Sequence, residues 1–204
     1  MWWLVGLCAL ALAAALPGGA ADERVIVALG DSLTAGFGVT PDEAWPALIE
    51  TRIRREGYPY RVVNAGVSGD TSAGGLRRVD WVLRARPEIA VVALGANDGL
   101  RGQEPGETRA NLDAIVRRLQ DAGVRVLLAG MRLPPNYGAE RAGAFAAVFA
   151  DVARRGRVPL MPFLLDGVAA DPGLNLADGL HPNAAGHRVI AERVWLHLRP
   201  LLRR

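Results

Sequence analysis

The residues with the clearest capacity for chemistry are a serine and a histidine that lie far apart in the chain. Ser32 stands in Gly30-Asp31-Ser32, directly after the apolar run 25–29. A short apolar segment that is rich in β-branched residues and closed by glycine is typical of a buried strand leading into a tight turn. We therefore expect Ser32 at the carboxyl end of a strand, where open parallel α/β sheets bind their ligands.

A serine hydroxyl becomes a good nucleophile only when a base takes its proton, and that base needs an orienting partner. The sequence contains three histidines. His181 lies in Asp178-Gly-Leu-His181-Pro, a turn-forming segment in which the Asp178 carboxylate can reach the ring nitrogen that faces away from Ser32. His187 and His197 fall within a predicted helix and are interpreted as packing or surface residues. The pattern predicts Ser32 as nucleophile, His181 as base and Asp178 as its orienting partner.

Acyl transfer also requires hydrogen-bond donors for the oxyanion that develops on the substrate. Gly66 offers a backbone N–H that a substrate can approach closely, because no Cβ obstructs it. Asn97 offers a side-chain amide, and the N–H of Ser32 would be a third donor. Each feature also has an ordinary interpretation, in which Ser32 caps a helix, Asn97 belongs to a turn, and 178–181 is a surface loop. Their joint occurrence after predicted strands favours the chemical interpretation.

Strand-like and helix-like segments alternate along the chain and must position these residues. We predict strands over 24–29, 60–64, 88–94, 124–129 and 158–161, and helices over 41–56, 71–84, 107–121, 139–155 and 183–198. Strands separated by helices form parallel βαβ units with right-handed crossovers. The expected fold is a three-layer α/β/α sandwich, flavodoxin-like, with about five parallel strands. The loops after these strands would then meet at one edge of the sheet.

The first 21 residues predict a signal peptide. They carry no charged side chain, and an apolar stretch over 2–16 is followed by the small residues Gly18, Gly19, Ala20 and Ala21. This length suits the apolar region of a signal peptide and is short for a membrane span. An uncleaved anchor is the alternative, because the terminal amine is the only positive charge ahead of the apolar stretch. We expect a single domain over 22–204, located in the periplasm or secreted.

Composition excludes several classes of chemistry. All 24 basic residues are arginine, so a catalytic lysine is absent, and the single cysteine, Cys8, lies within the predicted leader. The mature chain would therefore have no disulfide, reactive thiol or cysteine metal site. The net charge of +3 is spread along the chain, which argues against nucleic-acid binding and allows only weak contact with anionic lipid surfaces. We expect a monomer.

Four short blocks, taken in order, resemble the SGNH (GDSL) hydrolase superfamily. They are Gly30-Asp-Ser32-Leu, Asn64-Ala-Gly66-Val-Ser-Gly-Asp, Gly95-Ala-Asn97-Asp and Asp178-Gly-Leu-His181-Pro. The resemblance covers about residues 24–198. It implies Ser32 as nucleophile and first oxyanion donor, Gly66 and Asn97 as further donors, and His181 with Asp178 as the base and its partner. It also implies that no metal and no cofactor takes part.

A narrower resemblance concerns the periplasmic thioesterase I/lysophospholipase L1 branch, whose members are often called arylesterases. It rests on Met131-Arg-Leu-Pro-Pro-Asn-Tyr-Gly, on Gly69-Asp-Thr-Ser and on the leader. It implies that Asp70, Pro135, Asn136 and Tyr137 contact a small-molecule acyl ester or thioester. Two alternatives stay open: a carbohydrate O-acetyl esterase with the same site plan, and a flavodoxin-like module that binds a ligand without turnover.

Overall fold

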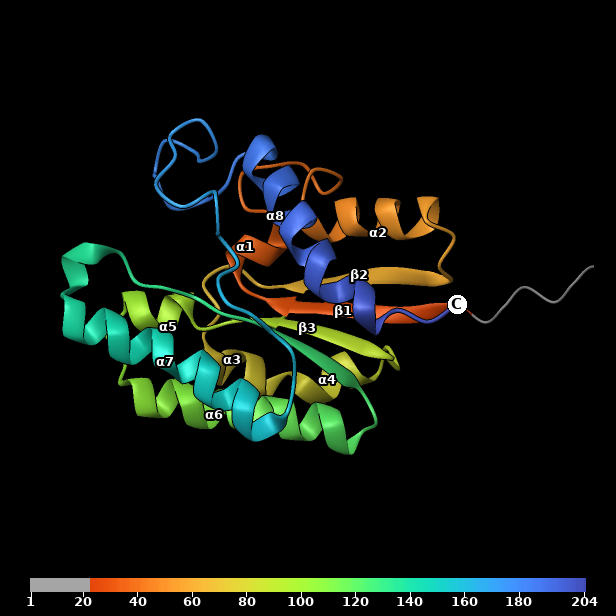
Figure 1. Ribbon diagram of the computed structural model, residues 1–204, viewed down its shortest axis with the longest axis horizontal. Helices are drawn as coiled ribbons and strands as arrows, with labels where there is room; N and C mark the ends of the chain where they lie inside the picture. Colours follow the sequence, from red (N-terminus) through yellow and green to blue (C-terminus); the bar gives the residue numbers. More distant parts are fainter. Residues whose placement is uncertain (1–22) are drawn as a thin grey trace, which may run out of the picture.

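The computed structural model describes residues 23–204, in which a parallel β-sheet runs through the middle of the molecule (Figure 1). The five strands of this part of the chain are β1 (Arg24–Gly30), β2 (Tyr60–Gly66), β3 (Ile89–Ala93), β4 (Arg125–Ala129) and β5 (Leu160–Met161). Their order is β2-β1-β3-β4-β5, and all neighbouring strands are parallel. This is the flavodoxin-like order, so the predicted fold class is confirmed.

Helices cover both faces of the sheet and complete the three layers (Figure 1). One face carries α2 (Trp45–Arg55) and α8 (Ala184–Leu198), which pack against each other. The other face carries α3 (Ser72–Arg77), α4 (Val79–Leu83), α6 (Pro105–Asp121) and α7 (Ala139–Gly156). Short helical turns lie in the connections, namely α1 (Ser32–Ala35), α5 (Ala96–Leu100) and η1 (Pro135–Tyr137), and η2 (Arg199–Leu201) follows α8 near the C-terminus.

The apolar runs in the sequence form the central strands of this sheet. All five residues of β3 are buried, as are residues 25–30 of β1. A parallel sheet covered on both faces needs apolar side chains on both sides, so its strands are apolar throughout rather than in alternation. The helices contribute one apolar side each; in α6 it consists of Leu112, Ile115, Val116 and Leu119.

Several predicted boundaries differ from the structure. The helix predicted from residue 41 begins at Trp45, because residues 41–44 form a turn and Ala44, the N-cap, has an extended backbone. The helix predicted over 71–84 is divided into α3 and α4 at Arg78, whose backbone leaves the helical region. The segment after β3 was predicted as a loop but forms α5, and the strand predicted over 158–161 is shortened to β5.

The strand order reverses at β1, which defines where a ligand would bind. From β2 the chain crosses to β3 on the other side of β1, so the loops after β1 and β3 diverge at their carboxyl ends. Gly30, the last residue of β1, pairs with Gly66 of β2 and Ala93 of β3. The three strand-end loops therefore lie together, as expected from the topology. Within residues 23–204, no helix combines the length and apolar content that crossing a bilayer requires.

Candidate active site

Ser32 is the first residue of α1, the short helix that follows β1 directly. Asp31 is the N-cap of this helix, and its Oδ1 accepts the N–H of Leu33 at 3.0 Å. The turn requires glycine at position 30, because a Cβ there would lie 2.0 Å from Thr34 Oγ1. Asp31 thus caps α1, and the Ser32 hydroxyl does not serve as the cap.

The loop before α8 brings a histidine and a carboxylate to this serine. His181 Nε2 lies 3.0 Å from Ser32 Oγ, and His181 Nδ1 lies 2.7 Å from Asp178 Oδ2. The exposed Phe37 ring packs against the imidazole in a tilted arrangement, with 4.5 Å between ring centroids and 41° between ring planes. The backbone also holds the loop in place, since the Leu176 N–H donates to the His181 carbonyl at 2.8 Å. The three residues predicted from the sequence therefore form one hydrogen-bonded series.

Asp178 is arranged to remain an anion. Its Oδ1 accepts the backbone N–H groups of Leu180 at 2.9 Å and His181 at 3.0 Å. These bonds, together with the bond from the His181 ring, lower the pKa of the Asp178 carboxyl to about 2. An ionised Asp178 fixes the His181 ring so that Nδ1 carries a proton and Nε2 can accept one from Ser32.

The two expected oxyanion donors lie close to Ser32 and are both engaged with acceptors of the protein. The Gly66 N–H donates to Asn64 Oδ1 at 2.9 Å. Asn97 Nδ2 donates to the Asp70 carbonyl at 2.9 Å and lies 3.4 Å from Asp31 Oδ2. Position 66 accepts no side chain, because a Cβ would lie 2.2 Å from the backbone nitrogen of Ala35.

A buried carboxylate keeps Asn97 in place. Asn97 is carried by α5, and the adjacent Asp98 is fully buried. Asp98 Oδ2 accepts the Ser72 N–H at 2.8 Å, and its Oδ1 accepts the Ser72 hydroxyl. Thr108 Oγ1 of α6 lies 3.4 Å from Asp98 Oδ1. Asp98 thus ties α5 to α3 and α6, which explains why this segment is a fixed helix rather than a simple turn.

Asp31 lies beneath the serine with no exposed surface. Burial raises the pKa of its carboxyl from 3.8 to about 7, although the Leu33 N–H bond acts in the opposite direction. The nearby His181 also favours the charged form, whereas Asp70 disfavours it. Asp31 also contacts the Asn97 amide, whose Nδ2 lies 3.4 Å from Asp31 Oδ2.

Arg78 is a residue that sequence reasoning missed. Its Nε donates to Asp70 Oδ2 at 2.7 Å, and its two terminal nitrogens donate to the carbonyls of Ala65 at 2.6 Å and Gly30 at 2.8 Å. One guanidinium thereby joins the ends of β1 and β2 to Asp70, whose own carbonyl holds Asn97. Only its position at the break between α3 and α4 distinguishes Arg78 from other arginines, and the sequence does not show that break.

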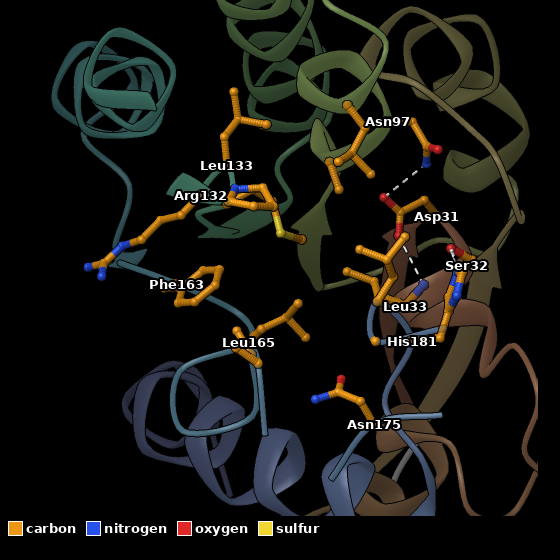
Figure 2. A pocket seen from close by; sticks show the side chains of 18 of the residues that line it. Asp31, Ser32, Leu33, Asn97, Arg132, Leu133, Phe163, Leu165, Asn175 and His181 are labelled. Carbon is orange, nitrogen blue, oxygen red and sulfur yellow. Dashed lines mark hydrogen bonds between the residues drawn. The ribbon is translucent and has the colours of Figure 1, made fainter. Parts of the chain in front are cut away.

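A cavity of about 670 Å³ opens beside Ser32 and His181 (Figure 2). Its walls include the apolar side chains of Leu33, Leu133, Phe163 and Leu165, and also Pro135 and Asn136 of the predicted substrate loop. The other two predicted contacts lie outside this lining. Asp70 forms an ion pair with Arg78, and the Tyr137 hydroxyl donates to the Leu100 carbonyl at 3.2 Å.

A sequence model of the GDSL-like Lipase/Acylhydrolase family matches residues 28–189 of this chain. The chain belongs to this family. Esterase TesA of Pseudomonas aeruginosa is 43% identical over 183 residues, which are 89% of this chain and 91% of the relative. Thioesterase 1/protease 1/lysophospholipase L1 of Escherichia coli K12 is 39% identical over 184 residues, which are 90% and 87% of the two chains. The crystal structure of TesA superimposes with a TM-score of 0.86 at 43% identity, covering 88% of this chain and 100% of that chain.

As a GDSL-like acylhydrolase, the chain is a hydrolase that acts on ester bonds. The resemblance inferred from the four sequence blocks is confirmed, and a binding module without turnover finds no support. Among the described residues of this acylhydrolase, no group of three or more His, Cys, Asp and Glu side chains is placed to hold a metal ion.

His187 is distinct from the reaction centre of the acylhydrolase. It is 1% exposed, and its Nδ1 accepts the backbone N–H of Trp45 at 3.3 Å, which links α8 to α2. Burial lowers the pKa of His187 to about 4. From the sequence, His187 is predicted to lie in a helix as a packing or surface residue. The structure shows that it is a buried packing residue between α8 and α2.

Proposed function

We propose that Ser32 attacks the carbonyl carbon of an acyl ester or thioester while His181 Nε2 takes the hydroxyl proton. The observation that carries this proposal is the continuous series from Ser32 Oγ through the His181 ring to the ionised Asp178, with distances of 3.0 and 2.7 Å. Asp178 would stabilise the imidazolium that forms. The protonated His181 then gives its proton to the departing alcohol or thiol, which leaves an acyl group on Ser32. Water attacks this acyl-serine by the same route and releases the acid.

The oxyanion would be held by the N–H groups of Ser32 and Gly66 and by the Asn97 amide. In the structure Gly66 donates to Asn64, and Asn97 donates to Asp70. The substrate oxygen must therefore replace Asn64 Oδ1 at the Gly66 N–H. The Asn97 amide has a second N–H, and the substrate oxygen can accept it in place of the long 3.4 Å contact with Asp31 Oδ2 while the bond to Asp70 is kept. Hydrogen bonds of this kind commonly reach their best geometry only in the complex with substrate. Losing one such donor typically lowers kcat by about 10²–10³.

The cavity supports an acyl chain as the group that accompanies the scissile carbonyl. Its volume of about 670 Å³ and its apolar walls suit a chain longer than acetyl. The names of the relatives agree with this choice, because they describe an esterase and a thioesterase/lysophospholipase. A carbohydrate O-acetyl esterase would need polar groups to recognise a sugar; most of the residues in this lining are apolar, although Arg132, Asn136 and Asn175 are polar. We infer acyl esters and thioesters as the substrate class.

The location of the enzyme is inferred from its first 21 residues, which lie outside the described part of the structure. We propose that they direct export and are removed, so that a single domain over 22–204 acts in the periplasm or outside the cell. Sequencing the amino terminus of protein recovered from a periplasmic extract tests this. The expected monomer and the weak contact with anionic lipid are tested by light scattering and by sedimentation with vesicles.

The decisive experiment compares wild type with Ser32→Ala on p-nitrophenyl esters and acyl-CoA thioesters of increasing chain length. We expect wild type to hydrolyse chains well beyond acetyl and Ser32→Ala to form no acyl-enzyme. An organophosphonate should modify wild type at Ser32 and leave the variant unlabelled, as seen by the mass of the intact protein. Turnover that survives in Ser32→Ala refutes the mechanism. A steep preference for acetyl over octanoyl esters would instead favour the O-acetyl esterase.

A further inference from the structure

The cavity beside Ser32 contains one arginine, Arg132, on the segment between β4 and η1. Its neighbours in sequence, Met131 and Leu133, are buried, while Arg132 itself is exposed. Figure 2 shows its guanidinium on the side of the cavity away from Ser32 and His181. The cavity therefore has a reaction centre on one side and a permanent positive charge on the other.

The guanidinium is supported by an aromatic ring and not by an acid. Its central carbon lies 5.2 Å from the centroid of the Phe163 ring. None of the ion pairs formed within residues 23–204 includes Arg132. A guanidinium that contacts a ring through its face keeps its in-plane N–H groups free, and these form paired hydrogen bonds with carboxylate or phosphate. Arg132 is thus presented as an anion-binding group.

The rest of the lining is compatible with an anion at this position. Asp31 is the only acidic residue in the lining, and it is fully buried beneath Ser32. Between Ser32 and Arg132 lie apolar side chains, among them Leu133 and Leu165 (Figure 2). A ligand that reaches both ends would need an ester carbonyl, an apolar spacer and a terminal anion.

We propose that Arg132 selects substrates that carry a carboxylate or phosphate, separated from the scissile carbonyl by an apolar spacer. This inference rests on the proposed function, because it takes Ser32 as the reacting end of the cavity. The anion can belong to the acyl group or to the leaving group. Since Arg132 is remote from the bond that breaks, it would bind ground state and transition state alike and act mainly on KM.

Two pairs of substrates distinguish an anion on the acyl group from an anion on the leaving group. In the acyl pair, the p-nitrophenyl half-ester of octanedioic acid, with a free carboxylate, is compared with its methyl-capped neutral form. In the leaving-group pair, octanoyl-CoA is compared with octanoyl-N-acetylcysteamine, which has the same thioester and no phosphate. For each pair the measured quantity is the ratio of kcat/KM for the anionic member to kcat/KM for the neutral member.

The ratio is measured for wild type, Arg132→Gln and Arg132→Glu. We expect the ratio of at least one pair to fall about tenfold in Arg132→Gln and further in Arg132→Glu, mainly through KM. Phe163→Leu keeps the wall apolar but removes the ring, so it should lower the same ratio severalfold. Raising the salt concentration should lower the ratio of wild type and leave that of Arg132→Gln nearly constant.

Arg55→Glu is the matched control. Arg55 is an exposed arginine of α2, outside the cavity lining, so its reversal changes the net charge by the same amount. Its ratios should equal those of wild type. Ratios that are the same in wild type and Arg132→Gln for both pairs overturn the proposal, even if hydrolysis of the neutral members upholds the proposed function. A wild type that hydrolyses neither neutral member refutes the proposed function, and this inference with it.

Discussion

Acid should destabilise this enzyme through His187, a histidine with no part in the reaction. His187 is buried between α8 and α2, and its neutral ring accepts the Trp45 N–H. Burial disfavours the imidazolium and lowers the pKa of His187 from 6.5 to about 4, although Glu43 acts weakly in the opposite direction. Between these two values the unfolded chain binds a proton at His187 that the folded chain does not bind. The free energy of unfolding must therefore fall as the pH falls through this range.

The magnitude follows from the size of the pKa shift. Each pKa unit corresponds to about 1.4 kcal/mol, so a shift from 6.5 to about 4 lowers the free energy of unfolding by about 2 kcal/mol at pH 5 and about 3 kcal/mol at pH 4. Little stability is lost above pH 7, because His187 is neutral there in both the folded and the unfolded chain. A typical domain is stable by about 5–15 kcal/mol, so this single residue would be a major source of acid sensitivity.

The assay is urea unfolding of wild type and His187→Asn between pH 4 and pH 8. The Asn carbonyl can still accept the Trp45 N–H, but it does not titrate. The difference between the two proteins isolates His187, which is necessary because Asp31 contributes with the opposite sign. The pKa of Asp31 is raised to about 7 in the folded chain. Asp31 therefore keeps its proton in the folded chain at pH values above about 4, where it loses that proton in the unfolded chain.

We expect the stability of wild type relative to His187→Asn to rise by about 3 kcal/mol from pH 4 to pH 7.5. His197→Asn, on the same helix, serves as the control for replacing a histidine of α8. A difference between wild type and His187→Asn that does not vary with pH would show that burial does not shift this histidine, and the reasoning would be wrong.

Three further predictions concern the reaction centre. Asn97→Ala should lower kcat by about 10²–10³ with a smaller change in KM, because the amide is proposed to bind the oxyanion of the transition state. Changes of equal size in kcat and KM would contradict that role. Asp178→Asn should lower kcat by about 10²–10⁴, because the His181 ring loses the anion that fixes its tautomer, and a wild-type rate in stopped-flow acylation would exclude the role. Arg78→Ala should lower kcat by about tenfold or more, because it releases the ends of β1 and β2, and Arg78→Lys should recover part of the lost activity. If circular dichroism shows that the activity is lost only to the extent that the variant unfolds, Arg78 stabilises the fold and does not position the reaction centre.

Local patterns explain why the sheet, and the meeting of the three candidate catalytic residues, could be predicted. The strands β1 and β3 are uninterrupted apolar runs that end at glycine or just before it, and such runs need no tertiary information to be found. The proximity of Ser32, Asp178 and His181 could be predicted because few residues of this sequence are candidates for a nucleophile and a base, and because each stands in a turn-forming segment. The topology of parallel strands then requires the loops after β1, β2 and β3 to meet.

Contacts between distant segments explain what the sequence did not reveal. The division of a predicted helix at Arg78 results from bonds to Gly30, Ala65 and Asp70, and no local pattern encodes these partners. The helix α5 escaped prediction because it is five residues long and is held by the buried Asp98. That Asp70 and Tyr137 bind other parts of the chain is likewise visible only after the segments are packed.

Asn64 holds Gly66, one of the proposed oxyanion donors, in place. Asn64 accepts the Gly66 N–H through Oδ1 and donates through Nδ2 to the Thr34 carbonyl at 2.9 Å, so it orients Gly66 relative to α1 before substrate arrives. In the proposed reaction the substrate oxygen takes the Gly66 N–H, so Asn64 Oδ1 loses a donor. Asn64 is exposed, however, and water can replace that donor at little cost. The amide at position 64 can thus hold the donor in place without competing strongly for it, which is the arrangement that a preorganised oxyanion site requires.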